Sequence, residues 1–208
     1  MKIFSSLFFS LLFVNAFSQI NRKDFTQFVN PFIGTASKDT NSLSGSVFPG
    51  ACMPFGMVQL SPDNYDAPED PASAYNYKEK TIVGFSHTHL NGTGVGDLYD
   101  VLVQPIAGTV LWQPGDAAKP RSGYRSVFSH TTEKASPGYY AVQLDDYNIK
   151  VELTATEHVG FHKYNFPKTD SAYVLFDLDH TLDKKRPYWV CKVVAAHMKQ
   201  VAEGLFCC

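Results

Sequence analysis

Two neighbouring segments, at residues 140–144 and 149–156, constrain the fold more than any other feature of the chain. Apolar residues occupy every second position of 149–155, and a similar alternation runs through 140–144. A period of two predicts half-buried β-strands. The polar stretch 145–148 predicts a hairpin turn between them, and Ser136-Pro137-Gly138 predicts a turn before the first strand.

The rest of the chain also consists of short strand-like segments separated by turn residues. Prolines recur between apolar runs, and no stretch before residue 190 keeps a helical period. Many short strands separated by Gly and Pro turns predict an all-β fold, an antiparallel β-sandwich. Further strands are predicted at 57–60, 82–85, 101–104, 109–112, 124–129, 159–166 and 173–178. The end of the chain, 195–208, is helix-like in composition and is predicted to be an aberrant tail after a domain at 19–194.

The N-terminus predicts export. Lys2 precedes an apolar run at 3–17, and Ala16-Phe17-Ser18 places small residues where a signal peptidase cuts. Residues 1–18 are therefore predicted to be a signal peptide, with a periplasmic, extracellular or cell-surface destination. The run is shorter than the roughly 20 residues that span a bilayer, so no membrane span is expected.

The net charge and the spacing of the cysteines limit the kinds of partner and metal site that we expect. A net charge of −2 does not favour nucleic acid, whose phosphates require a basic surface. Of the four cysteines, Cys52 and Cys191 could form a disulfide in an exported protein, but none has the spacing of a zinc site. We expect them to be free thiols.

The densest polar cluster lies at 84–100 around a glycine-rich loop. His87 and His89 would point the same way on an extended segment, and Asp97 and Asp100 follow. The two histidines could contact a ligand or could support the loop through hydrogen bonds. For a lone His-x-His pair, hydrogen-bonded support is the favoured interpretation. No third ligand follows at metal-site spacing, so no metal site is expected in this chain.

A second cluster at 174–182 resembles the first motif of haloacid-dehalogenase-type phosphatases. Asp177 would be the nucleophile and Asp179 the acid. That chemistry needs an α/β fold, which the preceding strands do not predict, so this alternative is disfavoured. Glycoside hydrolysis needs a carboxylate pair, and no Asp or Glu here stands out as a raised-pKa acid.

Three spaced motifs resemble glycoside hydrolase family 92. They are VNPFIGT at 29–35, VFPGACMPFGMVQLSPD at 47–63 and GFSHTHLNGTGVGDLYD at 84–100, and 130–167 continues in register. The resemblance runs from Val29 to Val194.

The resemblance implies an exo-acting α-mannosidase that removes mannose from glycans with inversion and uses Ca²⁺. It also implies an N-terminal β-sandwich packed on a C-terminal (α/α)₆ barrel, with the pocket between them. The barrel would carry the catalytic acid and base and the Ca²⁺ ligands, so we expect no catalytic residue, and no hydrolysis, from this chain alone. The barrel is then an expected partner, and a free-standing carbohydrate-binding module is the alternative.

Residues carried over from the resemblance form the predicted substrate-pocket and domain-interface surface. They are Pro54, Phe55, Gly56, Asp63, His87, His89, Gly92, Gly94, Asp97 and Asp100.

Overall fold

The structure is a computed structural model that describes residues 23–36, 47–64, 73–92, 98–180, residue 195 and the strands at 199–202 and 205–207. The predicted signal peptide, Gly94, Asp97 and Cys191 lie outside the described residues. Within the described part, no helix is long and apolar enough to cross a membrane. Cys52 is a free thiol.

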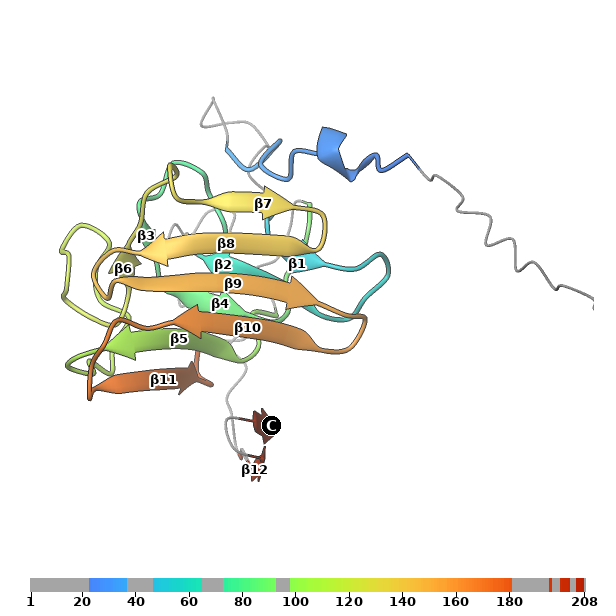
Figure 1. The fold of residues 1–208 in the computed structure, drawn as a ribbon. Coiled ribbons are helices and arrows are strands. Elements are labelled where there is room, and N and C mark those ends of the chain that lie inside the picture. Colours follow the sequence, from blue (N-terminus) through green and yellow to red (C-terminus); the bar gives the residue numbers. More distant parts are fainter. Residues whose placement is uncertain are drawn as a thin grey trace, which may run out of the picture.

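Two antiparallel sheets lie face to face, with the four-stranded sheet in front in Figure 1. The five-stranded sheet has the order β1 (Ala51–Cys52), β2 (Gln59–Asp63), β4 (Gly84–Ser86), β5 (Leu102–Ala107) and β11 (Ala172–Asp177). The four-stranded sheet has the order β10 (Gly160–Asn165), β9 (Ile149–Ala155), β8 (Tyr139–Leu144) and β7 (Lys134–Ser136). The predicted all-β antiparallel β-sandwich is confirmed.

Smaller elements complete the described chain. Two short pairs join β3 (Thr81–Ile82) to β6 (Ser126–Val127) and β12 (Lys199–Ala202) to β13 (Leu205–Cys207). The single helical element among the described residues is the 3₁₀ turn η1 (Thr26–Phe28).

The hairpin of β8 and β9 forms where the alternation predicts it. Leu144 pairs with Ile149, so 145–148 is the turn, and Asn148 takes a left-handed φ of 52°. Asparagine tolerates this conformation better than most residues. Every second residue of β9 is buried, as a half-buried strand requires.

The turn before β8 is also confirmed. Ser136 pairs with Tyr139, which leaves Pro137 and Gly138 as a two-residue turn. Gly138 has a φ of 76°, a conformation open to glycine without steric cost.

The main core fills the space between the sheets. Leu60 and Phe85 come from one sheet and meet Val142, Val151 and Leu153 from the other. Burying each of these side chains contributes about 1.5–3 kcal/mol relative to exposure. A second cluster of Val83, Leu102, Ile106 and Tyr124 lies beside it, and the Tyr147 ring packs against both.

Two of the secondary-structure predictions are wrong. The segment 109–112 is a loop, because Gly108 ends β5 with a φ of 96° and turns the chain away from the sheet. The helix-like tail at 195–208 instead contains β12 and β13. The apolar spacing of so short a segment is compatible with either period, and strand pairing decided between them.

Candidate functional site

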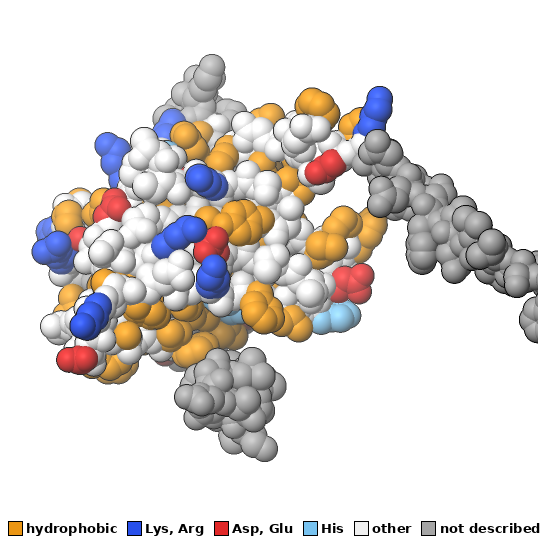
Figure 2. All heavy atoms as spheres, in the orientation of Figure 1, with side chains coloured by type: hydrophobic (Ala, Val, Ile, Leu, Met, Phe, Trp, Pro, Cys, Tyr) orange, Lys and Arg blue, Asp and Glu red, His pale blue; other side chains and the backbone are white. Residues whose placement is uncertain are grey.

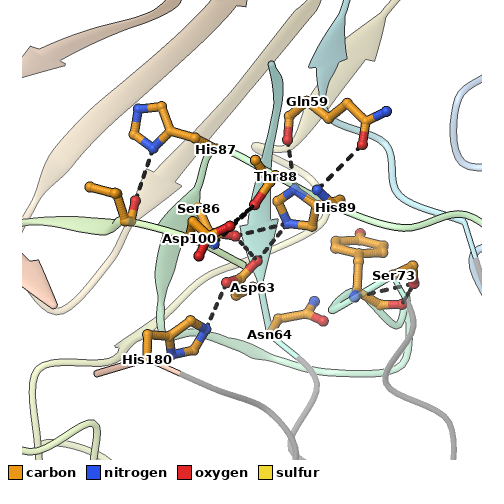
Figure 3. Close-up of polar contacts among 12 residues, drawn as sticks. Gln59, Asp63, Asn64, Ser73, Ser86, His87, Thr88, His89, Asp100 and His180 are labelled. Atoms are coloured by element: carbon orange, nitrogen blue, oxygen red, sulfur yellow. Dashed lines mark hydrogen bonds and ion pairs between the residues drawn. The ribbon is translucent and has the colours of Figure 1, made fainter. Parts of the chain in front are cut away.

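The glycine-rich loop after β4 is closed at its base by paired backbone contacts. The His87 amide donates to the Asp100 carbonyl at 3.1 Å, and the Tyr99 amide donates to the Thr88 carbonyl at 3.0 Å. The Thr88 hydroxyl adds a bond of 3.1 Å to the Asp100 carboxylate (Figure 3). Gly92, inside the loop, has a φ of 96° and open space around it. The two described ends of the loop are therefore joined by a hydrogen-bonded stem.

Asp63, at the end of β2, is the centre of a buried polar network beneath that loop. Its Oδ1 accepts from His89 Nε2 at 2.7 Å and from the Ser86 hydroxyl at 3.0 Å, and its Oδ2 accepts from His180 Nε2 at 2.8 Å (Figure 3). Burial by itself would raise the pKa of Asp63, but the charges and hydrogen bonds of His89 and His180 hold that pKa below its usual value. Asp63 is thus a buried carboxylate.

His89 lies between two acceptors. Its Nδ1 faces the Gln59 carbonyl oxygen at 2.6 Å, while its Nε2 faces Asp63. Because both ring nitrogens must donate, the geometry selects the imidazolium form, which pairs with the Asp63 carboxylate. The Phe48 and Tyr99 rings, with centroids at 5.1 and 5.9 Å, cover the imidazole.

His87 turns toward the other sheet. Its Nδ1 donates to the Val101 carbonyl at 2.9 Å, which leaves Nε2 as an acceptor for His162 Nε2 at 3.1 Å. The Tyr164 hydroxyl completes the chain with a bond of 2.6 Å to His162 Nδ1. Burial lowers the pKa of both histidines, that of His162 to about 3, so this pair is neutral.

The prediction that His87 and His89 point the same way is therefore wrong. β4 ends at Ser86, so the period of two does not continue through 87–89. Hydrogen-bonded support, the interpretation favoured for the histidines, describes His89, which is 1% exposed. Asp63, predicted on the substrate-pocket and domain-interface surface, is instead buried, at 0% exposed. Ser86, His162, Tyr164 and His180 were not predicted as members of these networks. The inward positions of His162 and Tyr164 on β10 were the one available signal.

The Pro54-Phe55-Gly56 segment lies in the loop between β1 and β2, beside the β9–β10 turn. The Met57 amide donates to the Glu157 carbonyl at 2.8 Å and joins the two loops. Phe55 is fully exposed, with a left-handed φ of 61°. The exposed apolar side chains of these two loops and of β10 form a surface that we call the apolar end patch: Met53, Phe55, Met57, Val159 and Phe161. Figure 2 shows orange side chains collected on this edge of the molecule.

The phosphatase-like motif has no matching architecture. β11 is an antiparallel neighbour of β5, whereas that enzyme class places its nucleophile in an α/β fold. The Tyr124 hydroxyl donates to the Asp177 carboxylate, so Asp177 has a structural partner. The all-β fold contradicts this alternative. Among the described residues no group of three or more His, Cys, Asp or Glu is arranged to hold a metal ion.

Known proteins with the same fold resemble this chain in sequence as well. An α-mannosidase of family GH92, BT3965 from Bacteroides thetaiotaomicron, is 45% identical, with a TM-score of 0.71 over 76% of this chain and 20% of its own. The same values hold for its complex with mannoimidazole. The GH92 inverting mannosidase BT2199 from that organism is 28% identical, with a TM-score of 0.56 over 74% of this chain and 19% of its own.

A curated relative from Arthroderma benhamiae, called an uncharacterized secreted glycosidase, is 28% identical over 176 residues, which are 78% of this chain and 21% of the relative. The chain thus spans about a fifth of the length of these proteins. The family model described as the glycosyl hydrolase family 92 N-terminal domain matches residues 28–206. The chain belongs to glycoside hydrolase family 92, as its N-terminal domain.

Proposed function

We propose that this chain is the pocket-forming N-terminal domain of an exported α-mannosidase that removes terminal mannose from glycans. One observation carries the proposal: the 45% identity to an α-mannosidase whose structure is also known with mannoimidazole. Export is supported by the signal-peptide pattern at 1–18 and by the secreted relative.

In this proposal the domain shapes the sugar site and does not transfer protons. Glycoside hydrolysis needs two carboxyl groups that reach the glycosidic bond from opposite sides. Asp63 is enclosed and engaged through both oxygens, and Asp100 is held at the loop base by Thr88. The acid and base would come from the barrel that the family resemblance implies.

Calcium would also belong to that barrel. Ca²⁺ takes six to eight oxygen ligands, mostly carboxylates and carbonyls. The buried carboxylate of Asp63 is surrounded by imidazole and hydroxyl donors, which do not fit a calcium shell. The described residues therefore fit a domain that adjoins the metal site without ligating it.

The apolar end patch and the loop stem would together form the contact with the barrel. Both lie at the end of the sandwich where β4 leads into the loop and β9 turns into β10. Exposed Phe and Met side chains of this kind mark contact surfaces in soluble proteins. Asp63 and His89 would hold the loop from below, with Gly92 at the ligand side.

A domain exchange tests the proposal. The N-terminal domain of BT3965 is replaced by this chain, and release of mannose from α-mannosides is measured with and without added Ca²⁺. We expect the exchanged enzyme to hydrolyse them and to lose activity with a calcium chelator, while this chain alone releases nothing. A folded, monodisperse exchanged protein without activity would contradict the proposal and favour a free-standing binding module.

A further inference from the structure

A cavity of about 420 Å³ opens at the other end of the sandwich, away from the glycine-rich loop. Its walls include Thr109 and Leu111 from the loop after β5, Arg121 and Arg125 from the same loop, and Asp146 and Tyr147 from the β8–β9 turn. β5 runs from Leu102, near the loop stem, to Ala107, at the cavity. These two points are roughly 16 Å apart along a strand that rises about 3.3 Å per residue. The tip of β5 and the β8–β9 turn lie at the same end in Figure 1.

Asp146 and Arg121 form a polar pair on the cavity wall, in which the Asp146 side chain is 12% exposed and the Arg121 side chain is 78% exposed. The Asp146 Oδ2 accepts from the Val127 amide at 2.8 Å, and its Oδ1 accepts from Arg121 Nε at 3.1 Å. Arg121 is held by Nε alone among the described contacts, so both terminal nitrogens of its guanidinium remain available to a ligand. Acidic and basic side chains gather at this end in Figure 2.

The backbone at Arg121 is unusual. Arg121 has a φ of 61°, in the left-handed region that side chains other than Asn, Asp and Gly disfavour. Non-glycine residues kept in this region cluster at ligand-binding sites.

The loop that carries Arg121 is held by internal hydrogen bonds. The Tyr124 amide donates to the Gln113 carbonyl at 2.9 Å, and the Asp116 amide donates to the Ser122 hydroxyl at 2.8 Å. A Cβ on Gly123 would overlap the Gln113 carbonyl oxygen and the Gly115 nitrogen, so the two sides of the loop touch directly. A site on this loop is therefore built before a ligand arrives.

Apolar and polar groups are combined in the manner of a sugar site. The Tyr147 ring is held by a bond of 2.9 Å from its hydroxyl to the Tyr124 carbonyl, and Leu111 is 39% exposed. Arg121 donates and Asp146 accepts side by side, which suits two adjacent hydroxyl groups that each donate and accept. The Asp146 carboxylate offsets the charge of Arg121, and the buried Arg125 guanidinium is engaged by the Pro114 carbonyl and the Thr81 hydroxyl, so the exposed wall favours a neutral ligand. We propose that this cavity binds a neutral hexose unit of a glycan, as an accessory site separate from the mannose pocket.

The proposal is tested by ligand-observed NMR and calorimetric titration of the full chain with methyl α-D-mannopyranoside. Arg121→Gly removes the guanidinium and leaves a residue suited to the left-handed backbone, so the loop is expected to fold normally. Lys119→Ala is the matched control: it removes one positive charge from the same loop, where Lys119 is exposed and pairs with Asp116 at 3.6 Å. We expect binding by the parent chain, at least tenfold weaker binding by Arg121→Gly and unchanged binding by Lys119→Ala.

Absence of binding at millimolar concentrations would overturn the proposal, as would equal affinity of Arg121→Gly and the parent. A preference for glucuronate over the neutral mannoside would overturn the neutral assignment. In the domain-exchanged enzyme, Arg121→Gly is expected to leave hydrolysis of small α-mannosides unchanged. Failure of the accessory site is thereby distinguished from failure of the proposed mannosidase role.

Discussion

His87 Nε2 lies 3.1 Å from His162 Nε2, and this contact joins the loop stem after β4 to β10 of the opposite sheet. The bond requires one neutral ring to accept from another, because two imidazolium rings would both donate and repel. The neighbouring His89 faces two acceptors, which selects the charged imidazolium form of its ring. Two histidines that are two positions apart thus have opposite protonation states.

The first prediction is acid destabilisation through His162. Its pKa is about 3 in the folded chain, mainly through burial, and about 6.5 when unfolded. Between these two pH values the unfolded chain binds more protons than the folded chain. The contribution of the neutral His162 to the free energy of unfolding is therefore complete above pH 6.5 and is lost as the pH drops toward 3. Urea unfolding at a series of pH values between 3 and 6.5 measures this loss of stability.

The control for this prediction separates His162 from other acid-sensitive groups. His162→Gln removes the titrating ring and is expected to flatten the dependence between pH 6.5 and 4. His158→Gln, at an exposed turn position, should leave the profile of the parent. An unchanged profile in His162→Gln would contradict the neutral His87–His162 pair.

The second prediction concerns Asp63→Asn. The change leaves the buried His89 imidazolium without its counter-charge, and removing one partner of a buried pair costs about 3–5 kcal/mol. Asp100→Asn, at an exposed loop-base position, should change the free energy of unfolding by about 0.5 kcal/mol or less. Denaturant unfolding of the two variants compares them, and similar values would argue against a charged Asp63–His89 pair.

The third prediction concerns Gly50, which precedes β1. A Cβ there would overlap the Leu60 carbonyl oxygen and the Ser61 Cβ on β2, so Gly50→Ala must separate these strands. We expect a loss of about 1–3 kcal/mol or more, as for other overpacked sites. Gly108→Ala, which has open space but a φ of 96°, should cost less, about 1 kcal/mol. The reverse order in thermal unfolding would contradict the close approach of β1 and β2.

The fourth prediction concerns the apolar end patch. Phe55→Ser and Phe161→Ser remove two exposed rings, which are 106% and 63% accessible, with little loss of core packing. We expect the double variant to self-associate less than the parent in size-exclusion chromatography and to be less active in the domain-exchanged enzyme. Trp112→Ser, an exposed aromatic in the loop after β5, is the matched control and should preserve activity. Equal loss of activity in both variants would argue against docking through the patch.

Local patterns predicted most of the sandwich. The alternation of 149–155, the polar turn 145–148 and the Pro137-Gly138 turn each specify a conformation through nearest neighbours, and each is confirmed. The three family motifs were recognised from the sequence alone, and the match to the family model over residues 28–206 confirms the family. The strand predicted at 109–112 failed because a single glycine conformation at Gly108 redirected the chain.

By itself, the sequence determined the fold class and the family, because alternation, turn chemistry and spaced motifs are all local. Only the tertiary structure decided what the polar residues do. His87 and His89 share a motif, yet one bonds to a residue 75 positions away on the other sheet and the other to a carboxylate 26 positions back. Protonation, burial and partner depend on which distant strands meet, and no local period encodes that meeting.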